Sequence, residues 1–365
     1  MNIEKIVPDN YQRAFSFKDV PYLLLDFSFL HYRSRNFLGV SQNGLECSYI
    51  PNKEAEECSE IGKEIFSSKR NFKIFETGFR KANAECAEYI KRAKQLKSIC
   101  AYDFYDLKNW LDKMYYYFEK TEFFFTDSCY FGEMSEILKN NLFVLGDKLK
   151  VDGRPLMMEL FTTVLIKISS LAAAQTRVGE KELAYYSFNE IVNLLEAGNK
   201  VPTERISGRK KSFVIYCENN QAAELTGEEK KVVLERFKEP DYAKASEFKG
   251  VIANRGKVVG KARVILVDVN VAYESYVKKL HKTEFKKGEI LVTETTSPDF
   301  VPLMNIAAGI IANQGGLNSH AAIYSRELGI PCLVATYHAT DILTTGDLVE
   351  LDANSGVVKI LKKIN

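Results

Sequence analysis

The fold of the second half of the chain is decided by the stretch Gly315-Gly316-Leu317-Asn318-Ser319-His320-Ala321-Ala322-Ile323-Tyr324-Ser325-Arg326-Glu327-Leu328-Gly329-Ile330-Pro331. Its paired glycines allow the backbone to approach another group closely. They deliver a Ser-His pair to the start of a predicted helix, where free N–H groups and the helix dipole favour an anion. A neutral imidazole is a nucleophile. We therefore expect the helix start to hold a phosphoryl group carried on His320.

The residues around this stretch alternate between strand and helix signals. β-branched and apolar runs predict strands, and Gly309 and Gly329 are helix stops. The strands are predicted at 258–267, 289–293, 310–312, 331–336, 348–352 and 357–361, and the helices begin at Ser297 and Ser319. This order predicts a compact mixed α/β domain.

Composition changes near residue 240, which indicates two domains. Residues 1–240 contain 35 of the 43 aromatic residues but only 11 of the 21 glycines. The stretch from Lys238 to Glu247 is polar and includes Pro240, as linkers do. We therefore predict a first domain over 1–240, a linker over 241–248 and a second domain over 249–365.

The first domain is predicted to be mostly α-helical, because apolar residues recur there at intervals of three and four. The expected helical segments are 54–97, 107–125, 156–174 and 181–198, with a break at 152–155 and one strand at 211–217. Ser187 and Glu190 form a capping-box signal. Residues 10–50 receive no assignment.

Charge and cysteine content exclude several classes of protein. Fifty basic and 48 acidic residues give a net charge of +2, so no global field favours nucleic acid or an anionic membrane. No apolar run reaches 18 residues and the first residues lack a secretory pattern, so we expect neither a membrane span nor a signal peptide. Seven scattered cysteines without a CxxC pair favour reduced thiols in the cytoplasm, and no metal-ligand spacing is visible.

Four segments of the second domain together resemble the swivelling phosphohistidine domain of the phosphoenolpyruvate-utilising enzymes. This family includes phosphoenolpyruvate synthase, pyruvate phosphate dikinase and rifampin phosphotransferase. The segments are Lys249–Val264, Gly288–Thr293 with Pro298, the histidine stretch, and Gly346–Asp352 with Gly356–Val358. Residues 182–191 and 206–210 are similar to the region before that domain in the synthase and rifampin-type enzymes, where a helical domain of the latter binds the phosphate acceptor.

The resemblance implies a C-terminal β/β/α swivelling domain in which His320 is phosphorylated. It assigns phosphate support to Gly315, Gly316 and Ser319, although Ser319 is equally well explained as a helix cap. No ATP-grasp domain and no pyruvate-binding barrel are visible in the sequence. The implied protein is thus an incomplete phosphotransferase, or kinase, whose ATP and Mg2+ come with a separate ATP-grasp partner and whose acceptor is an enolate or a hydroxyl.

Other candidates carry a weaker signal. His31, with Arg33 beside it, is the best minority candidate for an acceptor-site base, although surface or core placement fits a lone histidine better. The 13 aromatic residues in 102–131 predict either an aromatic-rich helical core or an apolar acceptor or partner surface. Arg326 is expected to be structural, since it lies 1.7 helical turns from His320.

A second function stays open on the sequence alone. A non-catalytic binding or regulatory protein could keep the phosphohistidine fold and transfer nothing. Ala312-Asn313-Gln314 stands where family members commonly have a threonine and then an acidic residue, and this departure favours the second function. The sequence names neither the acceptor, the direction of transfer nor the oligomeric state.

Overall fold

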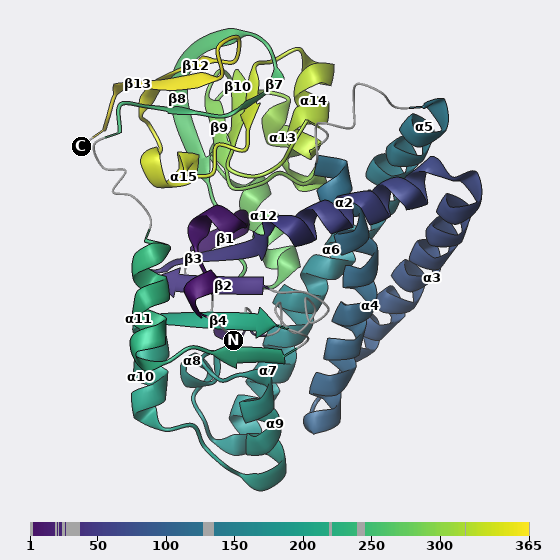
Figure 1. Ribbon diagram of the computed structural model, residues 1–365, viewed down its shortest axis with the longest axis vertical. Coiled ribbons are helices and arrows are strands. Elements are labelled where there is room, and N and C mark those ends of the chain that lie inside the picture. Colours follow the sequence, from purple (N-terminus) through teal and green to yellow (C-terminus); the bar gives the residue numbers. More distant parts are fainter. Residues whose placement is uncertain are drawn as a thin grey trace. The chain divides into compact units, whose positions relative to one another are not determined.

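A computed structural model describes residues 3–18, 20, 22–23, 26, 37–126, 135–218, 221–238, 245–317 and 319–364 (Figure 1). The described residues separate into two compact units. The first is made mainly of residues up to Lys238, and the second mainly of residues 245–268 and 274–364. The predicted linker over 241–248 stays a prediction, because 241–244 lie outside the described residues; the sheet of the second unit already begins at Glu247.

The first unit contains an antiparallel sheet of five strands in the order β1-β3-β2-β4-β5. These strands are β1 (Tyr11–Lys18), β2 (Phe37–Gln42), β3 (Leu45–Pro51), β4 (Ser212–Glu218) and β5 (Gln221–Glu224). Helix α11 (Gly227–Arg236) packs on one sheet face, where Val233 joins Leu38, Val40 and Val214 in a buried cluster. The expectation of a mostly helical first part is right for the rest of this unit but missed four of these five strands.

Helices make up the remainder of the first unit. They are α2 (Asn52–Ser67), α3 (Lys69–Ala93), α4 (Ala101–Thr126), α5 (Glu136–Val144), α6 (Lys150–Glu159), α7 (Leu165–Thr176), α8 (Glu180–Leu183), α9 (Phe188–Ala197) and α10 (Thr203–Lys211). Ser68 interrupts the predicted segment 54–97 and caps α3 by accepting the N–H of Asn71. Ser187 and Glu190 form the predicted capping box of α9.

The predicted break at 152–155 is wrong. Gly153 and Pro155 lie inside α6, and π-helical turns at Leu145–Leu149 and Leu160–Val164 join α6 to α5 and α7. A Cβ on Gly153 would lie 3.0 Å from ring carbons of Phe79 on α3. The glycine therefore serves close helix packing rather than a turn, and the π turns accommodate the irregularity.

Within the described residues, one helix is long and apolar enough to cross a membrane by length and composition alone, Lys150–Thr176. The core helix of a soluble protein passes the same test, and 44% of the apolar window is buried inside the structure.

Two aromatic residues of helix α4 pack against aromatic rings of α3. Tyr117 stacks on Phe79 at 4.9 Å and Trp110 on Tyr89 at 5.5 Å, which favours the aromatic core over an apolar binding surface for that part of 102–131.

The second unit is built on an eight-stranded sheet in the order β6-β13-β12-β8-β9-β10-β11-β7. Its strands are β6 (Glu247–Lys249), β7 (Val251–Asn254), β8 (Lys257–Ile265), β9 (Ile290–Thr293), β10 (Gly309–Ala312), β11 (Cys332–Val334), β12 (Leu348–Asp352) and β13 (Val357–Lys362). Strands β8 to β11 are parallel to one another, and the other neighbours pair antiparallel. All six predicted strands of this domain are present.

Four short helices accompany this sheet: α12 (Tyr273–His281), α13 (Val301–Met304), α14 (His320–Leu328) and α15 (Ala339–Ile342). The predicted stop of α14 is correct, because Gly329 adopts the left-handed conformation at its end. Ile290, Val292, Ile311 and Leu333 lie fully buried between sheet and helices. Because β9, β10 and β11 are parallel neighbours, their carboxyl ends meet at one edge of the sheet, where ligands commonly bind in parallel sheets.

Candidate functional site

His320 is the first residue of α14 at that edge of the sheet. Ser319 is the helix cap, and its hydroxyl accepts the N–H of Ala322 at 3.4 Å. The N–H of Ser319 donates to the carbonyl of Gly316 at 3.0 Å, which folds the glycine loop back on the helix start. The predicted residues Gly315, Gly316, Ser319 and His320 are thus neighbours in the structure as well as in the sequence, while their role in phosphate binding stays a prediction.

Gly315 occupies a position that only glycine tolerates well. Its φ is +105°, and a Cβ built there would lie 2.7 Å from the Cβ of Ser319. Both the left-handed backbone and the close approach therefore require glycine. This residue permits the tight turn that places Ser319 at the start of the helix.

The imidazole of His320 is held on two sides. Its Nδ1 lies 3.2 Å from Oγ1 of Thr296, a buried residue beyond the end of β9. Its ring centroid lies 4.4 Å from that of Tyr324, one turn further along α14. When Nδ1–H donates to Thr296, the lone pair lies on Nε2, which the structure shields from solvent. In that tautomer, the lone pair of Nε2 is the one that can act as a nucleophile.

Thr296 is itself fixed by the loop that follows β9. The N–H of Gln314 donates to the carbonyl of Glu294 at 2.8 Å, and a side-chain oxygen of Glu294 accepts the N–H of Val267. Thr293 Oγ1 donates to the carbonyl of Thr295 at 3.1 Å. The loop is thereby tied to the strand ends on both sides. Sequence reasoning missed Thr296; its place just after a buried strand, near the predicted Ser297 helix start, was the available signal.

Asn313 ties together two loops at the same edge. It is buried, and its Nδ2 donates to Thr340 Oγ1 at 2.7 Å while its Oδ1 accepts the Thr336 hydroxyl at 3.3 Å. The N–H of Tyr337 donates to its carbonyl at 3.0 Å. Ala335 and Tyr337 have φ values of 51° and 59°, a left-handed backbone that costs about 1 kcal/mol or more per residue. The unusual Ala312-Asn313-Gln314 segment therefore supplies a buried structural clamp.

The remaining candidates from the sequence are His31, Arg33 and Arg326. His31 and Arg33 lie outside the described residues. Arg326 is exposed and donates to the carbonyl of Ala253 at 3.3 Å, as expected of a structural residue. In the part of the chain that the structure describes, no group of three histidine, cysteine or acidic side chains is arranged to hold a metal ion.

Known proteins match the part of the chain that contains this site. Residues 285–356 match the family described as PEP-utilising enzyme, mobile domain. A probable phosphoenolpyruvate synthase from Staphylothermus marinus is 43% identical over 126 residues, which are 33% of this chain and 14% of that protein. The phosphoenolpyruvate synthase of Pyrococcus furiosus is 56% identical over 73 residues, 20% of this chain and 9% of that protein.

These matches are local. The chain spans only a small part of the length of these relatives, so what the whole relatives do is not transferred by identity alone. A solution structure of Enzyme I covers 94% of this chain at 13% identity, with a TM-score of 0.22. A score this low carries no argument about the fold. The relation to known proteins therefore rests on the domain around His320.

Proposed function

We propose that this chain, whose residues 285–356 match the mobile domain of the PEP-utilising enzymes, carries a phosphoryl group on His320. The group would pass between an ATP-binding partner and an acceptor with a hydroxyl or enolate oxygen. One observation supports this most directly: His320 begins α14 inside the matched segment, with its Nδ1 against Thr296. Mg2+ and ATP are proposed to come with the partner.

The first proposed step transfers phosphorus to nitrogen. Nε2 of His320 attacks a phosphorus atom of the partner-bound nucleotide, an N–P bond forms, and the P–O bond to the leaving phosphate breaks with its electron pair on oxygen. Thr296 holds the ring so that Nε2 keeps its lone pair for the attack. The N–H groups at the start of α14 stabilise the negative oxygens that arrive there.

The second proposed step transfers the phosphoryl group from His320 to the acceptor. The acceptor oxygen attacks the phosphorus, an O–P bond forms, and the N–P bond breaks with its electrons on Nε2 of His320. An enolate attacks as the anion, whereas a hydroxyl gives up its proton to water as the O–P bond forms. Positioning and charge stabilisation supply most of the catalysis in such transfers. We propose that the first unit binds the acceptor or the partner, that the segment around Pro240 is the hinge, and that the reaction takes place in the cytoplasm.

The test is intact-mass spectrometry after incubation with candidate ATP-grasp proteins and Mg-ATP. We expect the mass of one phosphoryl group to be added, in an acid-labile and base-stable linkage. His320→Ala should not be labelled, whereas Arg326→Ala, a control on the same helix, should be labelled normally. Equal labelling of His320→Ala and the wild type would refute the assignment.

A second function is favoured by one observation. Nε2 of His320 is shielded from solvent in the structure, so the ring must become accessible before it reacts. A non-catalytic regulatory protein could keep the ring in this state permanently. Labelling in the presence of a donor, followed by loss of label to an added acceptor, distinguishes the carrier from that regulatory protein.

A further inference from the structure

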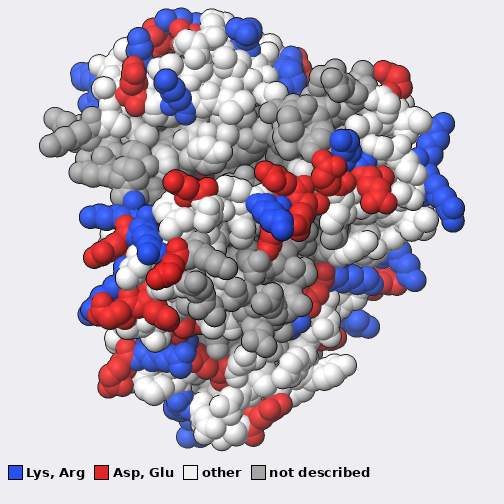
Figure 2. Space-filling model, in the orientation of Figure 1, with Lys and Arg blue, Asp and Glu red and all other residues white. Residues whose placement is uncertain are grey.

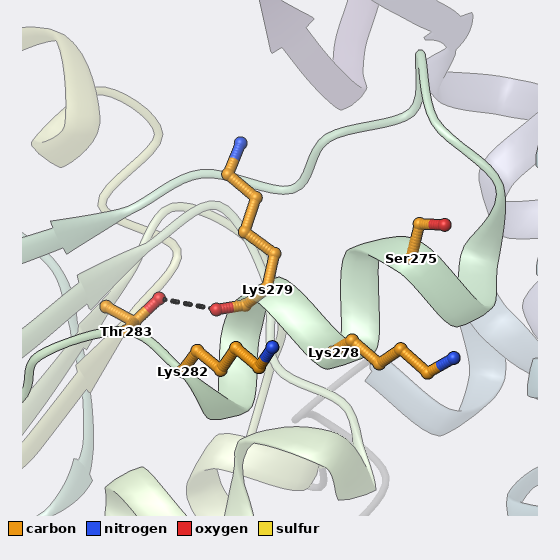
Figure 3. Close-up of a pocket in the computed structure, with 5 residues that line it drawn as sticks. All are labelled: Ser275, Lys278, Lys279, Lys282 and Thr283. Carbon is orange, nitrogen blue, oxygen red and sulfur yellow. Dashed lines mark hydrogen bonds between the residues drawn. The ribbon is translucent and has the colours of Figure 1, made fainter.

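Helix α12 and the residue that directly follows it carry three exposed lysines that the proposed chemistry does not use. Ser275, Lys278, Lys279 and Lys282 recur at intervals of three and four and are all exposed, so their backbone positions fall within about 100° around the helix axis. With Thr283 they line a hollow of about 520 Å³ (Figure 3). Figure 3 shows the side chains of Lys278 and Lys282 running along the lower side of the helix, whereas the side chain of Lys279 extends upward from it.

Two of these lysines form ion pairs with nearby acidic residues but stay largely exposed to solvent. Lys278 lies 2.7 Å from Glu274, and Lys279 lies 3.4 Å from Asp268, while both lysine side chains remain about 70% exposed. Solvent-exposed ion pairs of this kind contribute little to stability. The ammonium groups can therefore exchange these contacts for the carboxylates of another protein.

The opposite face of α12 is joined to the loop that holds His320. Tyr276 and Leu280 are buried. His281 Nε2 lies 3.1 Å from the carbonyl oxygen of Asp299, and the carboxylate of Asp299 accepts the hydroxyl of Ser297 at 3.0 Å. Ser297 directly follows Thr296, whose hydroxyl meets the His320 ring. A protein seated on α12 would thus sit on the element next to the phosphorylation site.

We propose that Lys278, Lys279 and Lys282 form a docking surface for an acidic surface of the protein that loads His320. This inference rests on the proposed function and names the chemistry of its partner. The matched family segment begins at residue 285, after α12 ends, so this face lies outside the segment matched to the family.

The dimensions and surroundings of the patch favour a protein over a nucleic acid. Nine helical residues extend about 13 Å, and the exposed positions lining the hollow carry no aromatic side chain on which bases could stack. Figure 2 shows acidic and basic side chains side by side over much of the face in view, and a net charge of +2 gives no global field that favours nucleic acid. A short patch of this kind complements a few carboxylates on a folded surface.

The test replaces the three lysines in the full chain and measures loading of His320 by the donor that labels the wild type. The variant Lys278→Glu/Lys279→Glu/Lys282→Glu should raise the KM for the donor protein about tenfold or more and leave kcat nearly unchanged. It should also weaken the dependence of kcat/KM on salt, because docking charges act on association. A triple Lys→Gln variant should lie between it and the wild type.

In a matched control, glutamate replaces three exposed lysines of β6 and β13 in the same unit, Lys249, Lys359 and Lys362. His320 of this variant should be phosphorylated with the KM and kcat of the wild type. Thermal unfolding confirms that each variant is folded. An unchanged KM and salt dependence in the α12 variants would overturn the docking surface and leave the carrier function intact. A wild type that no donor labels would overturn the carrier function and the docking surface with it. Single-stranded RNA binding that the α12 substitutions abolish would overturn the protein partner.

Discussion

Replacing Thr296 with valine tests how His320 is prepared for reaction. Valine keeps the shape of the buried side chain but removes the hydroxyl that lies 3.2 Å from Nδ1. A hydrogen bond of this kind contributes about 1 kcal/mol net, and its loss also lets the ring move between tautomers and orientations. Since 1.4 kcal/mol corresponds to a factor of ten in rate, we expect phosphoryl loading to slow about five- to tenfold.

Two measurements check this expectation independently. The loading rate is followed by intact mass at a saturating concentration of the ATP-binding partner, where docking no longer limits it. Nitrogen chemical shifts of His320 in the unphosphorylated protein report the tautomer without any partner. We expect the wild type to hold its proton on Nδ1 and the Thr296→Val protein to be a mixture of both tautomers.

The matched control is Thr296→Ser, which keeps a hydroxyl and should restore both the tautomer and most of the rate. Valine and wild-type proteins with the same loading rate and the same tautomer would refute the reasoning. A slow valine variant with an unchanged tautomer would show that Thr296 acts through the loop after β9 rather than through the ring.

Four further predictions concern stability and domain structure. Burial raises the pKa of Glu46 to about 8, although the hydrogen bond from Ser48 lowers it. The protonated carboxyl therefore contributes its full stability below about pH 4.5, and the free energy of unfolding falls by about 1.4 kcal/mol per pH unit as the pH rises toward 8. Denaturant unfolding of Glu46→Gln at several pH values should lack this slope. Gly315→Ala should cost about 1–3 kcal/mol, judged from its φ of +105°, and lower loading, whereas the unobstructed Gly208→Ala should not destabilise. Asn313→Ala should cost about 1–3 kcal/mol in thermal unfolding, because it leaves two buried threonine hydroxyls with fewer partners. Limited proteolysis should cut between residues 238 and 249 and release two folded fragments; resistance there would contradict a hinge.

The second domain was predictable because its local signals agree with its tertiary structure. Gly329 ends its helix as the sequence indicates, and Ser319 caps the helix that His320 begins. Gly309, predicted as a helix stop, is instead the first residue of β10, because α13 already ends at Met304. Buried parallel strands such as Ile290–Thr293 appear as short apolar runs between turn residues. Each rule that predicts these elements depends on neighbouring residues alone, so no knowledge of distant contacts was needed.

Strands β2 and β3 of the first sheet were missed because most of their residues are buried, on whichever face they lie. In β3 every residue from Glu46 to Ile50 is buried, so the alternation of apolar and polar residues that identifies a half-exposed strand is absent. The strand also includes Glu46 and Ser48, whose polar side chains are buried and joined by a 2.6 Å hydrogen bond. At Gly153 the sequence pattern predicted a break where the structure has a helix. The glycine is needed for close packing against Phe79, a contact that the neighbouring sequence does not reveal.

The site residues differ in the same way: the sequence identifies those in one contiguous motif and misses those that act through distant contacts. His320 was found because its motif is contiguous, whereas Thr296 and Asn313 act across 24 and 27 residues of sequence, on His320 and on Thr340 respectively. All four belong to the second unit, at the edge formed by the ends of β9, β10 and β11. The groups that would orient the histidine and hold its phosphoryl group are therefore contained in that unit. On the proposal that the first unit binds the acceptor, exchanging that unit should change the acceptor while leaving the loading of His320 intact.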